Sequence, residues 1–244
     1  MCRGMAIRIK FKGRCVVTFA LIAISANAEW RVVRKYYPQA EVQQSPFGEW
    51  FELSIGEKSV VFLQGGWGKV AAAASTQYGL QHWSPEVVIN LGTCGGFAGQ
   101  IERGAVILAT RTLIYDIIEQ MAPNPDEAIQ HYAVDLDLSF LKEPYPQPVQ
   151  PGLLVSADRD ICMEDIPMLR TRYSAVAADW ESGAIAWVCR RNNTRCLILR
   201  GVSDLVSEAG GEAYNALEVF HDGARRVMEP MLQALPEWLA AIKK

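Results

Sequence analysis

The sequence lacks the features that mark several large classes of protein. Its 244 residues carry 24 Lys and Arg against 27 Asp and Glu, so there is no excess of positive charge to bind the phosphates of nucleic acid. No long basic run follows Arg14, and no apolar stretch reaches the roughly 18 to 20 residues that a membrane span needs. Internal repeats and low-complexity segments are absent too. We therefore expect neither nucleic acid nor a membrane as a partner.

Cysteine and histidine are scarce and scattered. The three histidines and six cysteines form no C-x-x-C pair and show no ligand spacing, so we expect no metal and no cofactor. Most of the cysteines lie in apolar stretches, where a free thiol behaves as a small buried hydrophobe. This usage favours a reducing compartment, the cytoplasm. The cysteines are Cys2, Cys15, Cys94, Cys162, Cys189 and Cys196.

Short apolar runs, rich in β-branched residues, alternate with helical patterns along the chain. This alternation predicts one α/β domain with a largely parallel sheet. The proline-rich stretch 117–151 interrupts the pattern, and we interpret it as a surface excursion that could serve as a lid or a subunit contact. The predicted strands are 16–24, 59–64, 86–92, 105–115, 152–157 and 196–204, and the predicted helices are 69–83, 181–193 and a long C-terminal segment.

The first apolar run allows two interpretations. Residues 15–30, CVVTFALIAISANAEW, follow a basic stretch and end in a small-residue A-N-A site, as a secretory signal peptide does. The same run is largely β-branched and aromatic, which is typical of a strand buried on both faces. Periodicity alone does not separate the two.

Glycine-rich turns and carboxylates follow several of the predicted strands. The turns are GGWGK at 65–69 and GTCGG at 92–96, and the carboxylates are Asp179, Glu181 and Asp204. In an open α/β sheet, ligands bind beyond the carboxyl ends of the strands. These segments should therefore meet at one edge of the sheet, where glycines let the backbone approach a ligand closely.

In this order the segments resemble the nucleoside phosphorylase and nucleosidase superfamily. The resemblance covers roughly residues 18 to 240. It implies a single-domain, three-layer α/β/α fold with a central mixed, largely parallel sheet over residues 13–244, preceded by an extension at 1–12. The segments that carry it are GGWGKVAAA (65–73), INLGTCGG (89–96), GAVI (104–107) with Asp116 beyond it, LVSAD (154–158), ADWESGAIA (178–186) and LRGVSD (199–204).

The same resemblance favours the strand over the signal peptide. In this superfamily the fold begins with a central strand that leads into a loop at the active site. Cleavage after Ala28 would remove that strand, leaving its neighbours with unpaired backbone. A cytoplasmic enzyme is therefore the expectation, with secretion or a periplasmic location as the alternative.

The resemblance also implies the catalytic roles. Asp204 matches the acid that protonates the leaving base, and Glu181 matches the glutamate that holds the ribose hydroxyls. Glu29 matches the glutamate that activates water, with Arg200 nearby, although a shift of one residue would put Trp30 there instead. Judged without the family, Asp204 is a helix cap and Glu181 a first-turn glutamate stabilised by the helix dipole.

Further residues of the pattern are expected to bind the substrate, and some depart from the family. Trp180 stands where a methionine usually lies under the ribose, Asp160 replaces an aromatic residue that stacks on the base, and Gly65 replaces a serine. The expected substrate-binding residues are Gly92, Thr93, Gly95, Asp160, Ile161, Asp179, Trp180 and Ser203.

The identity of residue 90 divides the superfamily by nucleophile. Phosphorylases carry an arginine there that binds phosphate, whereas nucleosidases carry asparagine, as this chain does at Asn90. We therefore expect a nucleosidase that hydrolyses a purine-type nucleoside, with or without a modification at the 5′ position. The resemblance also implies a homodimer or larger oligomer. Two alternatives stay open: a phosphorylase in which Arg31, Arg34 or Arg200 binds phosphate, and an inactive nucleoside-binding module.

Overall fold

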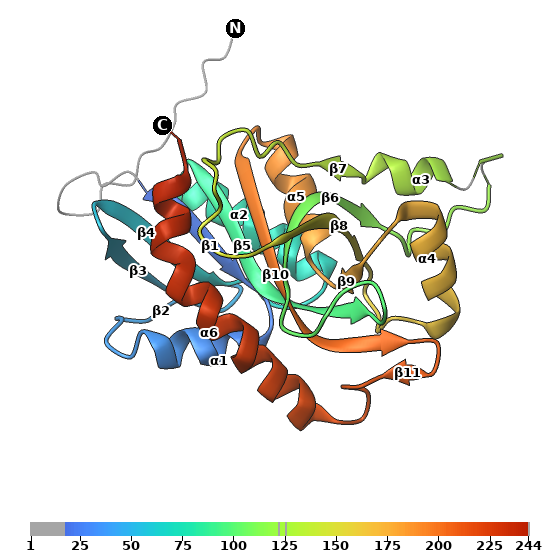
Figure 1. Ribbon diagram of the computed structural model, residues 1–244. Helices are drawn as coiled ribbons and strands as arrows, with labels where there is room; N and C mark the ends of the chain where they lie inside the picture. The colour runs from blue at the N-terminus through green and yellow to red at the C-terminus, as the bar shows by residue number, and fades with distance from the viewer. Residues whose placement is uncertain (1–17, 122, 125, 244) are drawn as a thin grey trace, which may run out of the picture.

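A central sheet with helices on both faces forms the molecule (Figure 1). The computed structural model describes residues 18–243 except 122 and 125, so the expected extension at 1–12 lies outside the described residues. The strands are β1 (Thr18–Ile24), β2 (Gln43–Gln44), β3 (Glu49–Ile55), β4 (Lys58–Gln64), β5 (Val87–Phe97), β6 (Val106–Ile114), β7 (Val134–Asp135), β8 (Gln150–Ser156), β9 (Ala177–Asp179), β10 (Arg195–Ser207) and β11 (Gly210–Gly211). The helices are α1 (Asn27–Tyr36), α2 (Lys69–Trp83), α3 (Asp126–His131), α4 (Ile166–Tyr173), α5 (Ser182–Arg191) and α6 (Leu217–Ala241), with a short 3₁₀ turn at Met163–Asp165.

The sheet is mixed, and part of it closes on itself. Its order is β11-β10-β6-β8-β9-β5-β1-β4-β3-β2, and β10 also pairs with β5. The strands β4, β1, β5 and β10 run parallel, as do β6, β8 and β9. Antiparallel pairing joins the two groups, between β10 and β6 and between β5 and β9. The five strands β5, β9, β8, β6 and β10 therefore form a closed ring beside the open part of the sheet.

Strand β1 lies in the middle of the open part, between β4 and β5. Alternate side chains belong to different cores: Ile22 and Ile24 lie in one apolar cluster, and Leu21 and Ala23 in the other. Because both faces are covered, the strand is a continuous apolar run without polar alternation. The strand interpretation of residues 18–24 is confirmed, while residues 15–17 of the same stretch lie outside the described residues.

Helices cover both faces, as the three-layer expectation requires. In Figure 1, α1 and α6 lie on the near side of the sheet and α2 and α5 on the far side. Within each pair the helices pack against each other, and α6 also packs on β10 and β5. The mixed α/β fold is thus confirmed, with antiparallel pairing where the two groups of parallel strands meet. One local expectation is wrong, because the chain after β1 forms helix α1 and not a loop.

The proline-rich stretch 117–151 carries α3 and β7 and runs partly over the surface. It is not wholly a surface excursion, since Phe140 and Leu141 are buried in the apolar core beneath α6. Among the described residues, no helix is both long and apolar enough to cross a membrane.

Candidate active site

The predicted edge of the sheet holds a cavity of about 540 Å³, which is within the usual range for small-ligand sites. Ten of the twelve residues predicted for catalysis or substrate binding line it. They are Glu29, Thr93, Gly95, Asp160, Ile161, Asp179, Trp180, Glu181, Ser203 and Asp204. Gly92 and Arg200 lie behind this lining. A second cavity, of about 590 Å³, opens where β10 begins, at the opposite edge, and none of the predicted site residues lines it.

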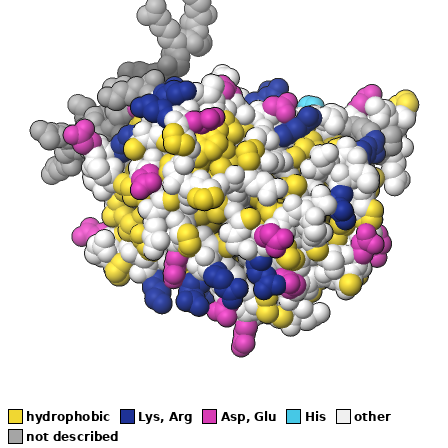
Figure 2. Space-filling view, in the orientation of Figure 1, with side chains coloured by type: hydrophobic (Ala, Val, Ile, Leu, Met, Phe, Trp, Pro, Cys, Tyr) yellow, Lys and Arg dark blue, Asp and Glu magenta, His cyan; other side chains and the backbone are white. Residues whose placement is uncertain are grey.

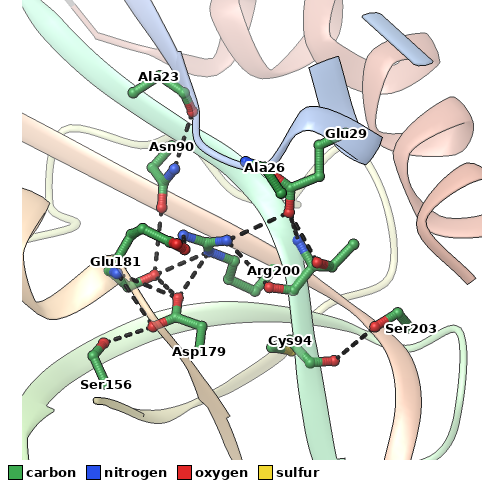
Figure 3. Close-up of polar contacts among 12 residues, drawn as sticks. Ala23, Ala26, Glu29, Asn90, Cys94, Ser156, Asp179, Glu181, Arg200 and Ser203 are labelled. Atoms are coloured by element: carbon green, nitrogen blue, oxygen red, sulfur yellow. Dashed lines mark hydrogen bonds and ion pairs between the residues drawn. The ribbon is translucent and has the colours of Figure 1, made fainter. Parts of the chain in front are cut away.

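The guanidinium of Arg200 is the centre of the buried polar cluster (Figure 3). Its side chain is 1% exposed and lies among three carboxylates. Arg200 Nε is 2.9 Å from Asp179 Oδ2, Nη2 is 3.3 Å from Glu181 Oε2, and Nη1 is 3.7 Å from Glu29 Oε1. Burial alone would lower the pKa of Arg200, but the three carboxylates together raise it. One fixed cation therefore balances part of the charge of three buried acids.

Glu29 reaches the cavity from the first turn of α1. Its Oε1 accepts hydrogen bonds from the backbone N–H of Thr93 (2.6 Å) and from the Thr93 hydroxyl (2.8 Å), and its Oε2 accepts one from the backbone N–H of Ala26 (3.0 Å). Trp30 points elsewhere, since its indole N–H donates to Glu49. Of the two alignments considered for this position, the structure places Glu29 at the cavity.

Gly92 has a spatial reason to be glycine. A methyl group built on its Cα would lie 2.2 Å from Arg200 Nη1 and 2.9 Å from Glu29 Oε1, both much closer than real Cβ contacts. The missing side chain leaves the space that the guanidinium occupies. The structure thus gives Gly92 a role in seating Arg200 and Glu29, while the ligand-facing surface begins at Thr93.

Glu181 sits where β9 turns into α5. Its carboxylate accepts a hydrogen bond from the backbone N–H of Gly68 (3.0 Å) and contacts Arg200. The pKa of Glu181 is raised to about 7, chiefly by burial. The charges of Asp179 and Glu29 also raise this pKa, and the charge of Arg200 lowers it. Glu181 is also the residue that immediately precedes the helix. Both aspects of the prediction, a helix-end position and a place at the cavity, are present together.

Asp204 faces the cavity because β10 is irregular at that point. The pairing of β10 with β5 shifts register between Val202 and Asp204, and such a bulge redirects the next side chain. The Ser203 hydroxyl donates to Asp204 Oδ1 at 2.6 Å. Burial raises the pKa of Asp204, and the Ser203 hydrogen bond lowers it in part. The helix-cap alternative is wrong, since Asp204 lies inside β10 and the next helix, α6, begins only at Leu217.

Asn90 is a structural residue in this fold. It is fully buried, its side-chain amide donates to the carbonyl of Ala23 at 3.0 Å, and its oxygen accepts from the Ser182 hydroxyl at 3.4 Å. An arginine at this position would have to fit among those partners. Asn90, the residue that distinguishes the two expected reactions, therefore connects β5 to β1 and to α5 in this fold.

Several lining residues were missed from the sequence. Trp67, in the first glycine turn, is 64% exposed and faces Trp180 with 6.3 Å between ring centroids. The position of Trp67 directly after a strand, within a predicted ligand-edge turn, could have revealed it. The residues contributed by the start of α6 gave no such signal, because only tertiary packing brings that helix to the cavity. The missed residues include Trp67, Arg159, Tyr214, Phe220 and His221, whereas Arg31, named from the sequence only for the phosphorylase alternative, also lines the cavity.

Known proteins resemble this chain in sequence and in fold. The family described as the Phosphorylase superfamily matches residues 18–237. The 5′-methylthioadenosine/S-adenosylhomocysteine nucleosidase of Actinobacillus succinogenes is 33% identical over 202 residues, 77% of this chain and 85% of that protein. The nucleosidase of the same name from Tolumonas auensis is 26% identical over 218 residues, 85% of this chain and 94% of that protein.

Solved structures share the fold at lower identity. A Helicobacter pylori 5′-methylthioadenosine/S-adenosylhomocysteine nucleosidase with butyl-thio-DADMe-Immucillin-A superposes with a TM-score of 0.76 at 16% identity, covering 91% of this chain and 99% of that one. The futalosine hydrolase of Helicobacter pylori gives 0.75 at 16% identity, covering 91% and 98%.

Proposed function

Because this chain belongs to the phosphorylase superfamily, we propose that it is a nucleosidase that hydrolyses the N-glycosidic bond of a purine nucleoside, one of the 5′-thio-substituted kind. The relatives named above are hydrolases of 5′-methylthioadenosine and S-adenosylhomocysteine. The reaction consumes water and yields the free purine base and the free 5-substituted ribose.

Asp204 is the proposed general acid. Cleavage of the bond between the anomeric carbon and the base leaves negative charge on the base, and a proton delivered to the purine N7 neutralises it. A carboxyl group serves only if it still carries its proton near neutral pH, and burial raises the pKa of Asp204 in that direction. No ion pair joins Asp204 to a cation in the described part of the chain, and the Ser203 hydrogen bond and the charge of Arg103 offset only part of the rise in the pKa of Asp204 that burial causes.

Glu181 and Glu29 act on the sugar and on water. As the bond lengthens, the ribose gains positive charge, and an ionised Glu181 that accepts hydrogen bonds from its hydroxyls holds those bonds more tightly. Glu29, on α1, lines the same cavity, and we assign to it the proton from a water that attacks the opposite face of the sugar. Its carboxylate is held by Thr93, which fixes the direction from which that proton is accepted.

One observation carries the choice of water over phosphate: the guanidinium of Arg200 lies among Asp179, Glu181 and Glu29. A phosphate dianion at the nucleophile position would meet three carboxylates around a cation whose charge they already balance. Of the other arginines considered, Arg34 pairs with Glu49 at 3.5 Å. Neutral water meets no such repulsion.

The test is to incubate the protein with 5′-methylthioadenosine, with and without phosphate, and identify the products. We expect adenine and free 5-methylthioribose at the same rate in both buffers. Formation of a ribose 1-phosphate would show a phosphorylase instead. Tight binding without release of the base over hours would show a binding module.

We further propose a cytoplasmic homo-oligomer. The described cysteines Cys94, Cys162, Cys189 and Cys196 are free thiols, as in a reducing compartment. Trp67, which lines the cavity, is 64% exposed, and further exposed apolar side chains are Val70 (81%), Ile118 (69%) and Met121 (93%). The ion pair between Lys69 and Asp116 joins the two segments that carry them. Large exposed apolar side chains on two segments that an ion pair holds together support a subunit contact.

A further inference from the structure

The first glycine-rich turn, residues 65–69, is held by a group of charged side chains that the proposed reaction does not use. Lys69 Nζ forms an ion pair with Asp116 and lies 3.6 Å from Asp158 Oδ2. The backbone N–H of Lys69 donates to Asp158 Oδ1 at 2.6 Å, and the backbone N–H of Asp158 donates to Asp116 Oδ2 at 3.0 Å. We call these three residues, Lys69, Asp116 and Asp158, the lysine cluster.

The lysine cluster joins the ends of three strands. Residues 65–69 follow β4, Asp116 follows β6, and Asp158 follows β8. Strand β4 belongs to the open part of the sheet, whereas β6 and β8 belong to the closed ring. The cluster therefore fixes a turn of the open part against the ring.

Lys69 differs from the basic side chains on the surface of the protein. Figure 2 shows Lys and Arg side chains gathered along the lower edge of the molecule, over α1 and the first half of α6. Exposed charges of that kind are solvated, and their ion pairs contribute little to stability. The side chains of Lys69 and Asp116 are each only 17% exposed, so their ion pair is screened less and fixes the turn more firmly.

The turn reaches the active site through Gly68. Its backbone N–H donates to Glu181 Oε1 at 3.0 Å. Gly68 has a φ of 84°, a value that other residues rarely adopt, and a methyl group built on its Cα would lie 3.0 Å from Asp158 Oδ1. Glycine at this position thus lets one residue touch both the lysine cluster and Glu181.

Other charged groups act on Glu181 from elements outside the turn. Arg200 on β10 faces it as a cation, and Asp179 at the end of β9 and Glu29 on α1 face it as anions. The Gly68 N–H adds a donor, and a donor to a carboxylate favours the ionised form. Of these four contacts, only the one from Gly68 depends on where the turn lies.

We infer that the lysine cluster keeps the turn where the Gly68 N–H stabilises the ionised carboxylate of Glu181. Lys69 is the positioning residue, because it belongs to the turn and also contacts both carboxylates of the cluster. It does not line the cavity, so it acts through the backbone of the turn. The inference rests on the proposed function, in which the reaction needs ionised Glu181. The cluster thus sets the pH at which the enzyme becomes active.

Two variants that remove charges of opposite sign test this inference. Lys69→Met removes a cation, and Asp158→Ala removes an anion together with the acceptor of the Lys69 N–H. Both should release the turn, so in both the rise of kcat/KM with pH should move up by about one pH unit, as expected for one hydrogen bond to a charged group. The ratio of variant to wild-type kcat/KM should climb from about one tenth on the acidic side towards one on the alkaline side. Long-range charge alone would move the two variants in opposite directions, and that result overturns the inference.

Two further variants are the controls. Asp158→Asn keeps an acceptor for the Lys69 N–H, so its pH profile should stay close to that of the wild type. Lys142→Met removes an exposed lysine outside the cluster and should leave the profile unchanged. If Lys69→Met and Asp158→Ala lower kcat/KM by the same factor at every pH, the cluster is only structural and the inference is wrong.

Carbon NMR of the Glu181 carboxyl group separates this inference from the proposed function, because it follows the titration without any reaction. Protein labelled at its glutamates gives the signal, and Glu181→Gln identifies it. An upward shift of the titration midpoint in Lys69→Met and Asp158→Ala supports the inference, even if the products show a phosphorylase. An unshifted midpoint overturns it, even if the wild-type protein hydrolyses 5′-methylthioadenosine without phosphate.

Discussion

At the scale of single residues, the two carboxyl groups proposed for the chemistry differ in their neighbours. Asp204 accepts a hydrogen bond from Ser203 and lies apart from the Arg200 cluster, whereas Glu181 is one of the three acids that surround the guanidinium. Burial raises the pKa of both. The groups are therefore suited to opposite tasks, Asp204 to delivering a proton and Glu181 to holding a positive sugar once it is ionised.

Replacing Asp204 by asparagine separates proton delivery from folding. Asn keeps the shape and can still accept from Ser203, but it cannot protonate a leaving base. We expect turnover to fall about a hundredfold or more, the range for general acid catalysis. The melting temperature should stay nearly the same, because asparagine has the shape of a protonated aspartic acid and carries no charge. Steady-state kinetics and thermal unfolding measure the two effects.

A nucleoside whose base leaves readily without protonation should recover much of the turnover lost in Asp204→Asn. Asp222→Asn, on the exposed side of α6, is the control for the change of residue type and should behave like the wild type. If turnover in Asp204→Asn falls only in step with the folded fraction, Asp204 is structural and the proposed mechanism is wrong.

Ionisation of Glu181 should make stability fall and activity rise as the pH increases. Its pKa is about 7 in the folded protein against 4.5 as the usual value, so between these pH values the folded state holds the extra proton. The stability from this group is present below pH 4.5 and is lost as the pH rises through about 7. The proposed reaction needs ionised Glu181, so kcat/KM should rise over the same range of pH. Urea unfolding and steady-state kinetics across this range measure the stability and the activity.

Glu181→Gln should remove both trends from this window and lower transition-state stabilisation by about 3 kcal/mol, as for other positioned electrostatic groups. Glu57→Gln, at an exposed position in the turn between β3 and β4, should keep them. Unchanged kinetics in Glu181→Gln would show that Glu181 serves only as the residue before helix α5 and takes no part in the reaction.

At the scale of elements, the central strands and longer helices were predictable because burial on one or both faces leaves a periodic signal. Helix α1 was not predicted, because the family resemblance implied a loop after the first strand. The bulge before Asp204 has no local signature either, because it arises from the pairing of β10 with β5. Residues such as Arg31 and His221 meet only through the packing of α1 on α6, which no short stretch of sequence encodes.

Removing β1 tests its place in the sheet. A chain that begins at Glu29 loses the strand that pairs with both β4 and β5. It also loses Leu21, Ile22 and Ile24, whose burial contributes about 2 kcal/mol each, a large part of the typical 5–15 kcal/mol stability of a domain. We expect it to be insoluble or unfolded by circular dichroism, whereas a chain beginning at Lys12 should fold and turn over substrate. An active protein beginning at Glu29 would contradict the strand assignment.

At the scale of the whole molecule, the exposed apolar side chains on the two segments joined by Lys69 and Asp116 predict self-association. Ile118→Glu combined with Met121→Glu places two charges in the proposed contact, so the solution mass should fall to the 27.1 kDa of one chain. Met168→Glu, on α4, is the control and should keep the mass of the oligomer. Light scattering after gel filtration measures both. A wild-type protein that already elutes as a single chain would contradict the proposed contact.

The cluster around Arg200 also makes proton exchange part of substrate binding. Because burial raises the pKa of Glu181 towards neutrality, part of the molecules hold a proton on this carboxyl group near neutral pH. Ribose hydroxyls donate best to the ionised form, so binding of a neutral nucleoside should release a proton to the solvent from those molecules. The apparent heat of binding should then depend on the ionisation enthalpy of the buffer, and the affinity should increase with pH until Glu181 is fully ionised. The affinity of a site with one guanidinium and three acids thus depends on pH already at the binding step, before any bond is broken.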